Sequence, residues 1–123
     1  MSVHNIANQL VSLCRQGKFD EAVKELYSPD IVSIEPAGAG FIERAEGLDA
    51  YHEKGKAWQS MVQEFHGIEV SDPIVADQFF TCKMSMDITM KGGTREKSAE
   101  ICLYKVKDGK IVLEQFFYAS PAG

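Results

Sequence analysis

Residues 79–118 read FFTCKMSMDITMKGGTREKSAEICLYKVKDGKIVLEQFFY, and this stretch decides the fold. Apolar and polar residues alternate from Phe80 to Ile88, which is the period of a half-buried strand. Gly92-Gly93 and Asp108-Gly109 are hairpin signals that separate such segments. The stretch therefore predicts two long antiparallel hairpins.

Two helices and a short strand are expected at the N-terminal end of the chain. Ser2 can cap the first helix and Gly17 can end it, while residues 28–30 stop the second. Residues 31–35 then indicate a strand, and residues 36–47 a loop. The apolar positions recur every three or four residues: Val3, Ile6, Leu10 and Leu13, then Phe19, Val23 and Leu26.

A third helix is expected between the loop and the hairpins. Its polar residues, Lys54 among them, are expected to face solvent. The resulting order ααβαββββ predicts an α+β domain with helices packed on one face of a bent sheet. The apolar stripe of this helix consists of Leu48, Tyr51, Gly55, Trp58, Val62 and Phe65.

Length and composition predict one domain over residues 1–123. The net charge of −5 argues against a nucleic-acid partner. No apolar run approaches the roughly 20 residues that span a bilayer, so no membrane partner is expected. The three cysteines are an odd set without CxxC spacing, and the first residues lack the pattern of a signal peptide. A cytoplasmic protein with reduced thiols is expected.

The ordered elements carry a family resemblance. Glu35-Pro36, the amphipathic third helix, residues 107–111 (KDGKI) and residues 114–118 (EQFFY) resemble the nuclear-transport-factor-two-like superfamily. Within it the chain is most similar to the SnoaL-like proteins, relatives of polyketide cyclases, ketosteroid isomerase and limonene epoxide hydrolase. The resemblance implies a cone in which a curved antiparallel sheet wraps around the helices, an internal pocket, and a homodimer through the sheet.

Glu35 is the first catalytic candidate. The resemblance to ketosteroid isomerase implies that an acid before a proline is the general base, and an apolar pocket would raise its pKa toward neutrality. On this view Glu35→Gln costs little stability. The alternative is a surface acid at a strand end. The tyrosine that the isomerase also needs is replaced by Leu10, and the last-strand aspartate of the epoxide hydrolase by Phe116. Neither of those two reactions is therefore expected in its known form.

Glu100 and Glu114 are candidates for a second acid. Glu114 shares a strand face with Phe116 and Tyr118, and that face is either the cavity side or the solvated side. A two-residue turn at Gly92-Gly93 turns Glu100 outward, whereas a shift by one residue turns it inward. The family comparison favours the inward register, with Glu100, Cys102 and Tyr104 facing the pocket.

The remaining candidates would line the pocket. The methionines are either core filler or an adaptable wall for a small apolar or cyclic organic ligand. His52 is expected at the rim, and Cys102 has no neighbouring base that would make it a nucleophile. No His, Cys or acid cluster has metal-ligand spacing, and no phosphate loop is present, so neither metal nor cofactor is expected. The full set is Tyr51, His52, Trp58, Met84, Met86, Cys102, Phe116 and Tyr118.

Two functions remain open at this point. The first is cofactor-free acid/base chemistry on a lipophilic substrate: isomerisation, cyclisation, dehydration or hydrolysis. The second is a non-catalytic binding or association domain whose sheet forms a homodimer interface. The inward register of Glu100 leaves Ala99, Ile101 and Leu103 on the outer face, where a twofold contact would bury them.

Overall fold

The computed structural model describes residues 1–119, so residues 120–123 of the predicted domain lie outside the described residues. Helix α1 (Val3–Arg15) and helix α2 (Phe19–Leu26) pack against each other, and helix α3 (Leu48–Met61) follows later in the chain. Ser2 Oγ accepts the N–H of Asn5, and Gly17 ends α1 in the left-handed region (φ 72°), as expected. None of the helices within residues 1–119 has the length and apolar character needed to cross a bilayer.

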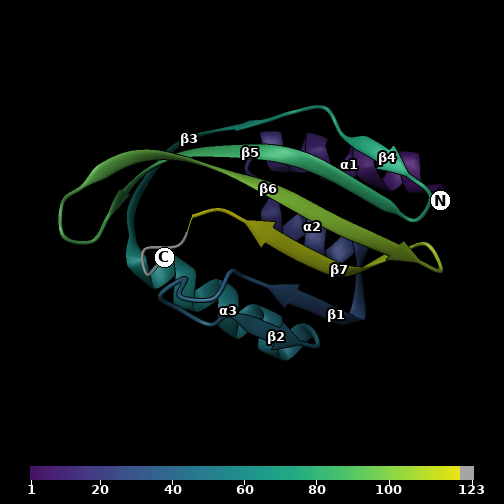
Figure 1. Ribbon diagram of the computed structural model, residues 1–123, viewed down its shortest axis with the longest axis horizontal. Helices are drawn as coiled ribbons and strands as arrows, with labels where there is room; N and C mark the ends of the chain where they lie inside the picture. The colour runs from purple at the N-terminus through teal and green to yellow at the C-terminus, as the bar shows by residue number, and fades with distance from the viewer. Residues whose placement is uncertain (120–123) are drawn as a thin grey trace.

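Seven strands form one curved, open sheet in the order β2-β1-β7-β6-β5-β3, with β4 paired to β5. The long β5–β6 hairpin arches over α1 and α2, while α3 lies beside β1 and β2 at the opposite edge of the sheet (Figure 1). The α+β class and the order of the long elements are confirmed. The strands are β1 (Tyr27–Ile34), β2 (Arg44–Glu46), β3 (Val62–Val70), β4 (Ile74–Ala76), β5 (Phe79–Met90), β6 (Arg95–Lys107) and β7 (Lys110–Phe117).

The sheet is mixed rather than antiparallel throughout. Strand β1 runs parallel to β7, with Ser33 opposite Glu114. This pairing joins an early strand to the last one. Between them the chain leaves the sheet, forms α3 and then re-enters the sheet. The expected loop 36–47 contains the short strand β2, which pairs antiparallel with the other edge of β1.

Two element boundaries differ from the expected ones. Helix α3 ends at Met61, so Val62 and Phe65 lie on strand β3 rather than on the helical stripe. Strand β3 forms backbone hydrogen bonds with β5. This tertiary pairing overrides the helical periodicity of the local sequence. Strand β1 begins at Tyr27 and includes Pro29, which lies in the irregular part of its pairing with β7. A proline is tolerated there because no regular ladder bond needs its N–H.

The β5–β6 hairpin decides which side chains face the helices. Its loop has three residues, Lys91–Gly93, because the backbone N–H of Met90 donates to the carbonyl of Thr94. Gly92 and Gly93 both have positive φ. With three loop residues, Met84 pairs with Glu100 and Cys82 with Cys102, so the even-numbered residues of both strands share one face.

That inner face packs on the helices and forms the core. Phe80 and Tyr104 stack with ring centroids 4.7 Å apart, and both are fully buried. They belong to one hydrophobic cluster with Ile6 and Leu10 of α1. In β7 the inner face continues through Glu114 and Phe116, which pair with Tyr104 and Cys102. The inner face is therefore apolar over α1 and becomes polar toward β1 and α3.

Candidate functional site

A buried hydrogen-bond network crosses the sheet from β7 to α3. At its β7 end the Glu114 carboxyl accepts a 2.7 Å hydrogen bond from Ser33 Oγ and a short one from Tyr27 Oη. The parallel pairing of β1 and β7 places Ser33 directly beside Glu114. Glu114 is only 4% exposed, so it lies on the inward face and not on the solvated one.

Lys54 connects this end of the network to Glu35. Its ammonium lies 2.6 Å from Glu35 Oε2 and donates a 2.9 Å hydrogen bond to Ser33 Oγ. The expectation that Lys54 faces solvent is wrong, since it is the most buried residue of α3. The buried cation is tolerated because it has a carboxylate and a hydroxyl as partners.

Glu35 lies just after β1 and is also buried. Tyr118 Oη donates a 2.6 Å hydrogen bond to Glu35 Oε1, so both carboxylate oxygens have partners. The backbone N–H of Glu35 donates to the carbonyl of Glu43 across the loop that leads to β2. Glu35 was expected among apolar groups, but the structure pairs it with an ammonium and a phenol.

Glu100 lies on the inner face of β6, opposite Met84, and is half-buried. Its one hydrogen-bond contact within residues 1–119 is the Cys102 thiol, 3.8 Å from Oε1. Burial raises the pKa of Glu100 to about 7, and the nearby carboxyls of Glu35 and Glu114 add to the rise. Glu100 is thus a carboxyl group that exchanges its proton near neutral pH.

Glu114 and Tyr118 of the network also have raised pKa values. Burial raises the pKa of Glu114, while the hydrogen bonds from Tyr27 and Ser33 partly oppose the rise. Burial and the hydrogen bond to Glu35 raise the pKa of Tyr118. Near neutral pH Tyr118 therefore remains a hydrogen-bond donor.

The predicted pocket residues differ widely in burial. Met84 and Cys102 lie in the hydrophobic core. Trp58 and Tyr118 are half-buried, and Trp58 follows Lys54 by one helical turn on the same face of α3. His52 is exposed, although its ring meets Tyr51 edge-on at 5.7 Å. Three other predicted pocket residues are partly buried and pack against the core: Tyr51, Met86 and Phe116.

Sequence reasoning missed Tyr27 and Ser33 of the network, and it also missed Lys54. The available signal was its spacing, three residues after Tyr51 and four before Trp58, which places it on the apolar stripe rather than opposite to it. Its carboxylate partner lies 19 residues earlier and was identified for other reasons. Nothing in the local sequence links the two.

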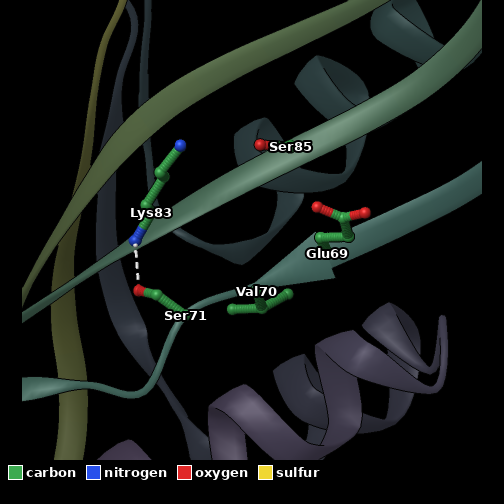
Figure 2. A pocket seen from close by; sticks show the side chains of 5 residues that line it. All are labelled: Glu69, Val70, Ser71, Lys83 and Ser85. Atoms are coloured by element: carbon green, nitrogen blue, oxygen red, sulfur yellow. Dashed lines mark hydrogen bonds between the residues drawn. The ribbon is translucent and has the colours of Figure 1, made fainter.

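A surface hollow of about 270 Å³ lies elsewhere, between β3 and β5 (Figure 2). Ser71 Oγ there accepts the backbone N–H of Lys83 at 2.8 Å. The hollow contains none of the three candidate glutamates, and on β5 its residues are odd-numbered, on the sheet face turned away from the helices. Its lining consists of Glu69, Val70, Ser71, Lys83 and Ser85. This hollow lies apart from the buried network, and the network is the stronger candidate for chemistry.

Comparison with known proteins settles the family. The family model described as SnoaL-like domain matches residues 1–118. The chain is 34% identical to a SnoaL-like protein of known structure from Mesorhizobium loti, which is provisionally assigned as a polyketide cyclase and is also described as a carbohydrate phosphatase. That match covers 96% of this chain and 100% of the other, with a TM-score of 0.88. The chain belongs to the SnoaL-like family.

More distant structures share the fold of this SnoaL-like protein. A protein of unknown function with a cystatin-like fold from Xanthomonas campestris is 20% identical, with a TM-score of 0.81. The match covers 99% of this chain and 94% of the other. TerC, co-crystallised with polyporic acid, is 14% identical over 96% of this chain and 92% of its own, with a TM-score of 0.78. Among curated proteins no match to the chain is found.

The buried acids among residues 1–119 of the SnoaL-like protein are paired with hydrogen-bond donors and are not grouped as metal ligands. Within residues 1–119 no three His, Cys, Asp or Glu side chains are grouped as metal ligands. The buried carboxylates instead bond to Lys54, Tyr27, Ser33 and Tyr118. Such a set is suited to holding and moving protons.

Proposed function

We propose that this SnoaL-like protein binds a small, mostly apolar organic molecule beside the buried network and transfers protons on it without a cofactor. Glu35 is the base and Glu100 the acid that exchanges a proton with the substrate. The reaction class is isomerisation, cyclisation, dehydration or hydrolysis. The observation that carries the proposal is the contrast between the surroundings of these two carboxyl groups.

Two acids with different surroundings can take opposite roles at one pH. Glu35 is bound by the Lys54 ammonium and the Tyr118 hydroxyl. Glu100 has no cation within hydrogen-bond distance among residues 1–119, and its pKa is about 7. At neutral pH one carboxyl group thus faces a cation while the other retains a proton for part of the time. The provisional assignment of the Mesorhizobium loti relative as a polyketide cyclase points to the same kind of chemistry.

Deuterium exchange tests this function without knowledge of the natural substrate. Cyclic ketones are incubated with the protein in D₂O, and uptake of deuterium at the carbon beside the carbonyl is followed by NMR. Glu35→Gln and Glu100→Gln should each lower the rate by roughly 100-fold, the scale of general acid–base catalysis. Glu53→Gln is the matched control, because Glu53 is an exposed acid on α3. Equal exchange in all variants would refute the proposal.

The second part of the proposal is a homodimer formed through the outer face of the sheet. Ile101 and Phe117 are direct partners on β6 and β7 and are 48% and 47% exposed. Ala99 is exposed beside them, and Leu103 and Leu113 are partly exposed. A twofold contact between such faces removes this apolar surface from water.

We also place the protein in the cytoplasm. Its three cysteines are free and buried. Free thiols are kept in reducing compartments, whereas proteins of oxidising compartments use cysteines as disulfides. Fractionation of the native host with an antibody against the chain tests this placement.

A further inference from the structure

The Lys54 ammonium has more donors than partners. An ammonium carries three N–H groups. Within residues 1–119 the hydrogen bonds of Lys54 go to Glu35 Oε2 and Ser33 Oγ, which use two of them. One N–H of a buried cation therefore has no oxygen or nitrogen acceptor among these residues.

Two aromatic rings surround the same nitrogen. The ring centroids of Phe116 and Phe41 lie 5.1 Å and 5.7 Å from Lys54 Nζ. Phe116 comes from the inner face of β7, and Phe41 from the loop between β1 and β2; both are half-buried. Rings at these distances attract a cation. An oxygen atom that lies between the two rings would bind the remaining N–H of Lys54 much more strongly than the rings do.

The charges around Lys54 favour a neutral ligand. Glu35, Glu100 and Glu114 all act on this region, while Lys54 is the cation among them. A ligand with a permanent negative charge would be repelled by these carboxyl groups. A neutral carbonyl oxygen is not repelled, and it can develop negative charge once a proton leaves the neighbouring carbon.

We propose that Lys54 is the oxyanion-stabilising donor of this site when a neutral carbonyl compound with a flat apolar body and a hydrogen on the carbon beside the carbonyl is bound. This inference rests on the proposed function and adds a third catalytic residue to it. The flat body lies against Phe41 and Phe116, and the carbonyl oxygen accepts the free N–H of Lys54.

The step is a proton transfer that balances within the site. The C–H bond beside the carbonyl breaks, and its proton forms an O–H bond with Glu35. The C–H electron pair forms the new C=C bond, and the carbonyl π pair moves to oxygen to give an enolate. Lys54 stabilises that oxygen through its charge and its N–H while remaining an ammonium. Return of a proton from Glu100 or Glu35 to carbon completes an isomerisation.

The other donors of the network are already engaged. Tyr27 donates to Glu114 and Tyr118 donates to Glu35. Each hydroxyl has a single proton, so neither can serve a substrate without losing its bond. Lys54 keeps both of its bonds while it binds a third acceptor.

Binding of 4-nitrophenol tests the inference, because its phenolate is a stable mimic of an enolate and absorbs visible light. Glu35→Gln removes the competing carboxylate and keeps Lys54, so this variant should bind the phenolate more tightly than the wild type. Adding Lys54→Met to that variant should weaken phenolate binding by roughly tenfold or more, the scale of a hydrogen bond to a charged group. Adding Lys56→Met instead is the matched control, since Lys56 is an exposed lysine on the same helix.

The outcomes separate the two proposals. Equal phenolate binding with and without Lys54 overturns the role of Lys54 but leaves the proposed function standing. No binding of 4-nitrophenol in either ionisation state, by any variant or the wild type, removes the ligand site and both proposals with it. Circular dichroism checks the fold of each variant. Lys54→Gln in the Glu35→Gln background replaces the methionine variant where that protein does not fold.

Discussion

The Lys54 ammonium and the Glu35 carboxylate lie 2.6 Å apart, and each side chain exposes only 7% of its surface. The two residues come from different layers, α3 and the end of β1. A buried pair of this kind gains little over two apolar residues, but removing one partner leaves an uncompensated charge. The stability of the fold and the proposed proton transfer therefore both depend on Lys54 and Glu35.

Lys54→Met should destabilise the fold by about 3–5 kcal/mol, because it leaves the Glu35 carboxylate buried without its cation. Combining it with Glu35→Gln should restore part of the loss. Urea unfolding of both variants measures the difference. A loss below about 1 kcal/mol in the single variant would mean that the pair is solvated in solution.

Glu35→Gln should lower the rate of deuterium exchange by roughly 100-fold and also reduce stability. The expectation from sequence was that this variant costs little stability, and it assumed apolar surroundings. The structure instead leaves the Lys54 ammonium facing a neutral amide. Exchange kinetics and urea unfolding on the same sample check both effects, and Glu53→Gln should change neither.

Because of Glu100, the free energy of unfolding should fall as the pH rises. Its pKa is raised from 4.5 to about 7 in the folded protein, so between these values the folded state binds more protons than the unfolded state. The free energy of unfolding then falls from about pH 4.5 to about pH 7 and levels off above. Glu114, whose pKa is also raised, acts in the same direction. Urea unfolding at about pH 5 and about pH 8 should show a smaller difference for Glu100→Gln than for the wild type.

Ile101→Lys should convert the proposed dimer into a monomer. The substitution puts a charge opposite Phe117, in the middle of the apolar outer face. Sedimentation equilibrium should give twice the chain mass for the wild type and the chain mass for the variant. Phe65→Lys is the control, because Phe65 is 42% exposed, pairs with Ile88 of β5 and lies against Phe19 of α2, on the opposite face of the sheet. A monomeric wild type at micromolar concentration would contradict the dimer.

Local patterns predicted the elements well, because helical and strand periodicities depend on near neighbours. The alternation from Phe80 to Ile88 and the two hairpin signals led directly to β5, β6 and β7. The parallel pairing of β1 with β7 was missed, since Ser33 and Glu114 are 81 residues apart and the sequence of neither segment indicates that it pairs with the other. The three glutamates were selected in advance, but their cation was not.

The register of the β5–β6 hairpin, which decides whether even- or odd-numbered residues face the helices, could not be predicted from the sequence. One loop residue decides whether Glu100 faces the helices or the solvent, and a glycine pair alone does not specify a loop of two or three residues. In the structure, the pairing of Met90 with Thr94 fixes a loop of three residues. Long-range pairing thus determines both the register and the position of the candidate acid.

The pairing of β1 with β7 also has a consequence for the order in which the protein is made. Ser33 leaves the ribosome 81 residues before Glu114, and Glu35 leaves it 83 residues before Tyr118. Until β7 emerges, one edge of β1 has no partner, and Lys54 and Glu35 lack the β7 side of their enclosure. The helices and the β5–β6 hairpin can form during translation, but the network is completed only after β7 and Tyr118 have emerged. A chain that terminates before β7 would thus keep most of its core and have no site.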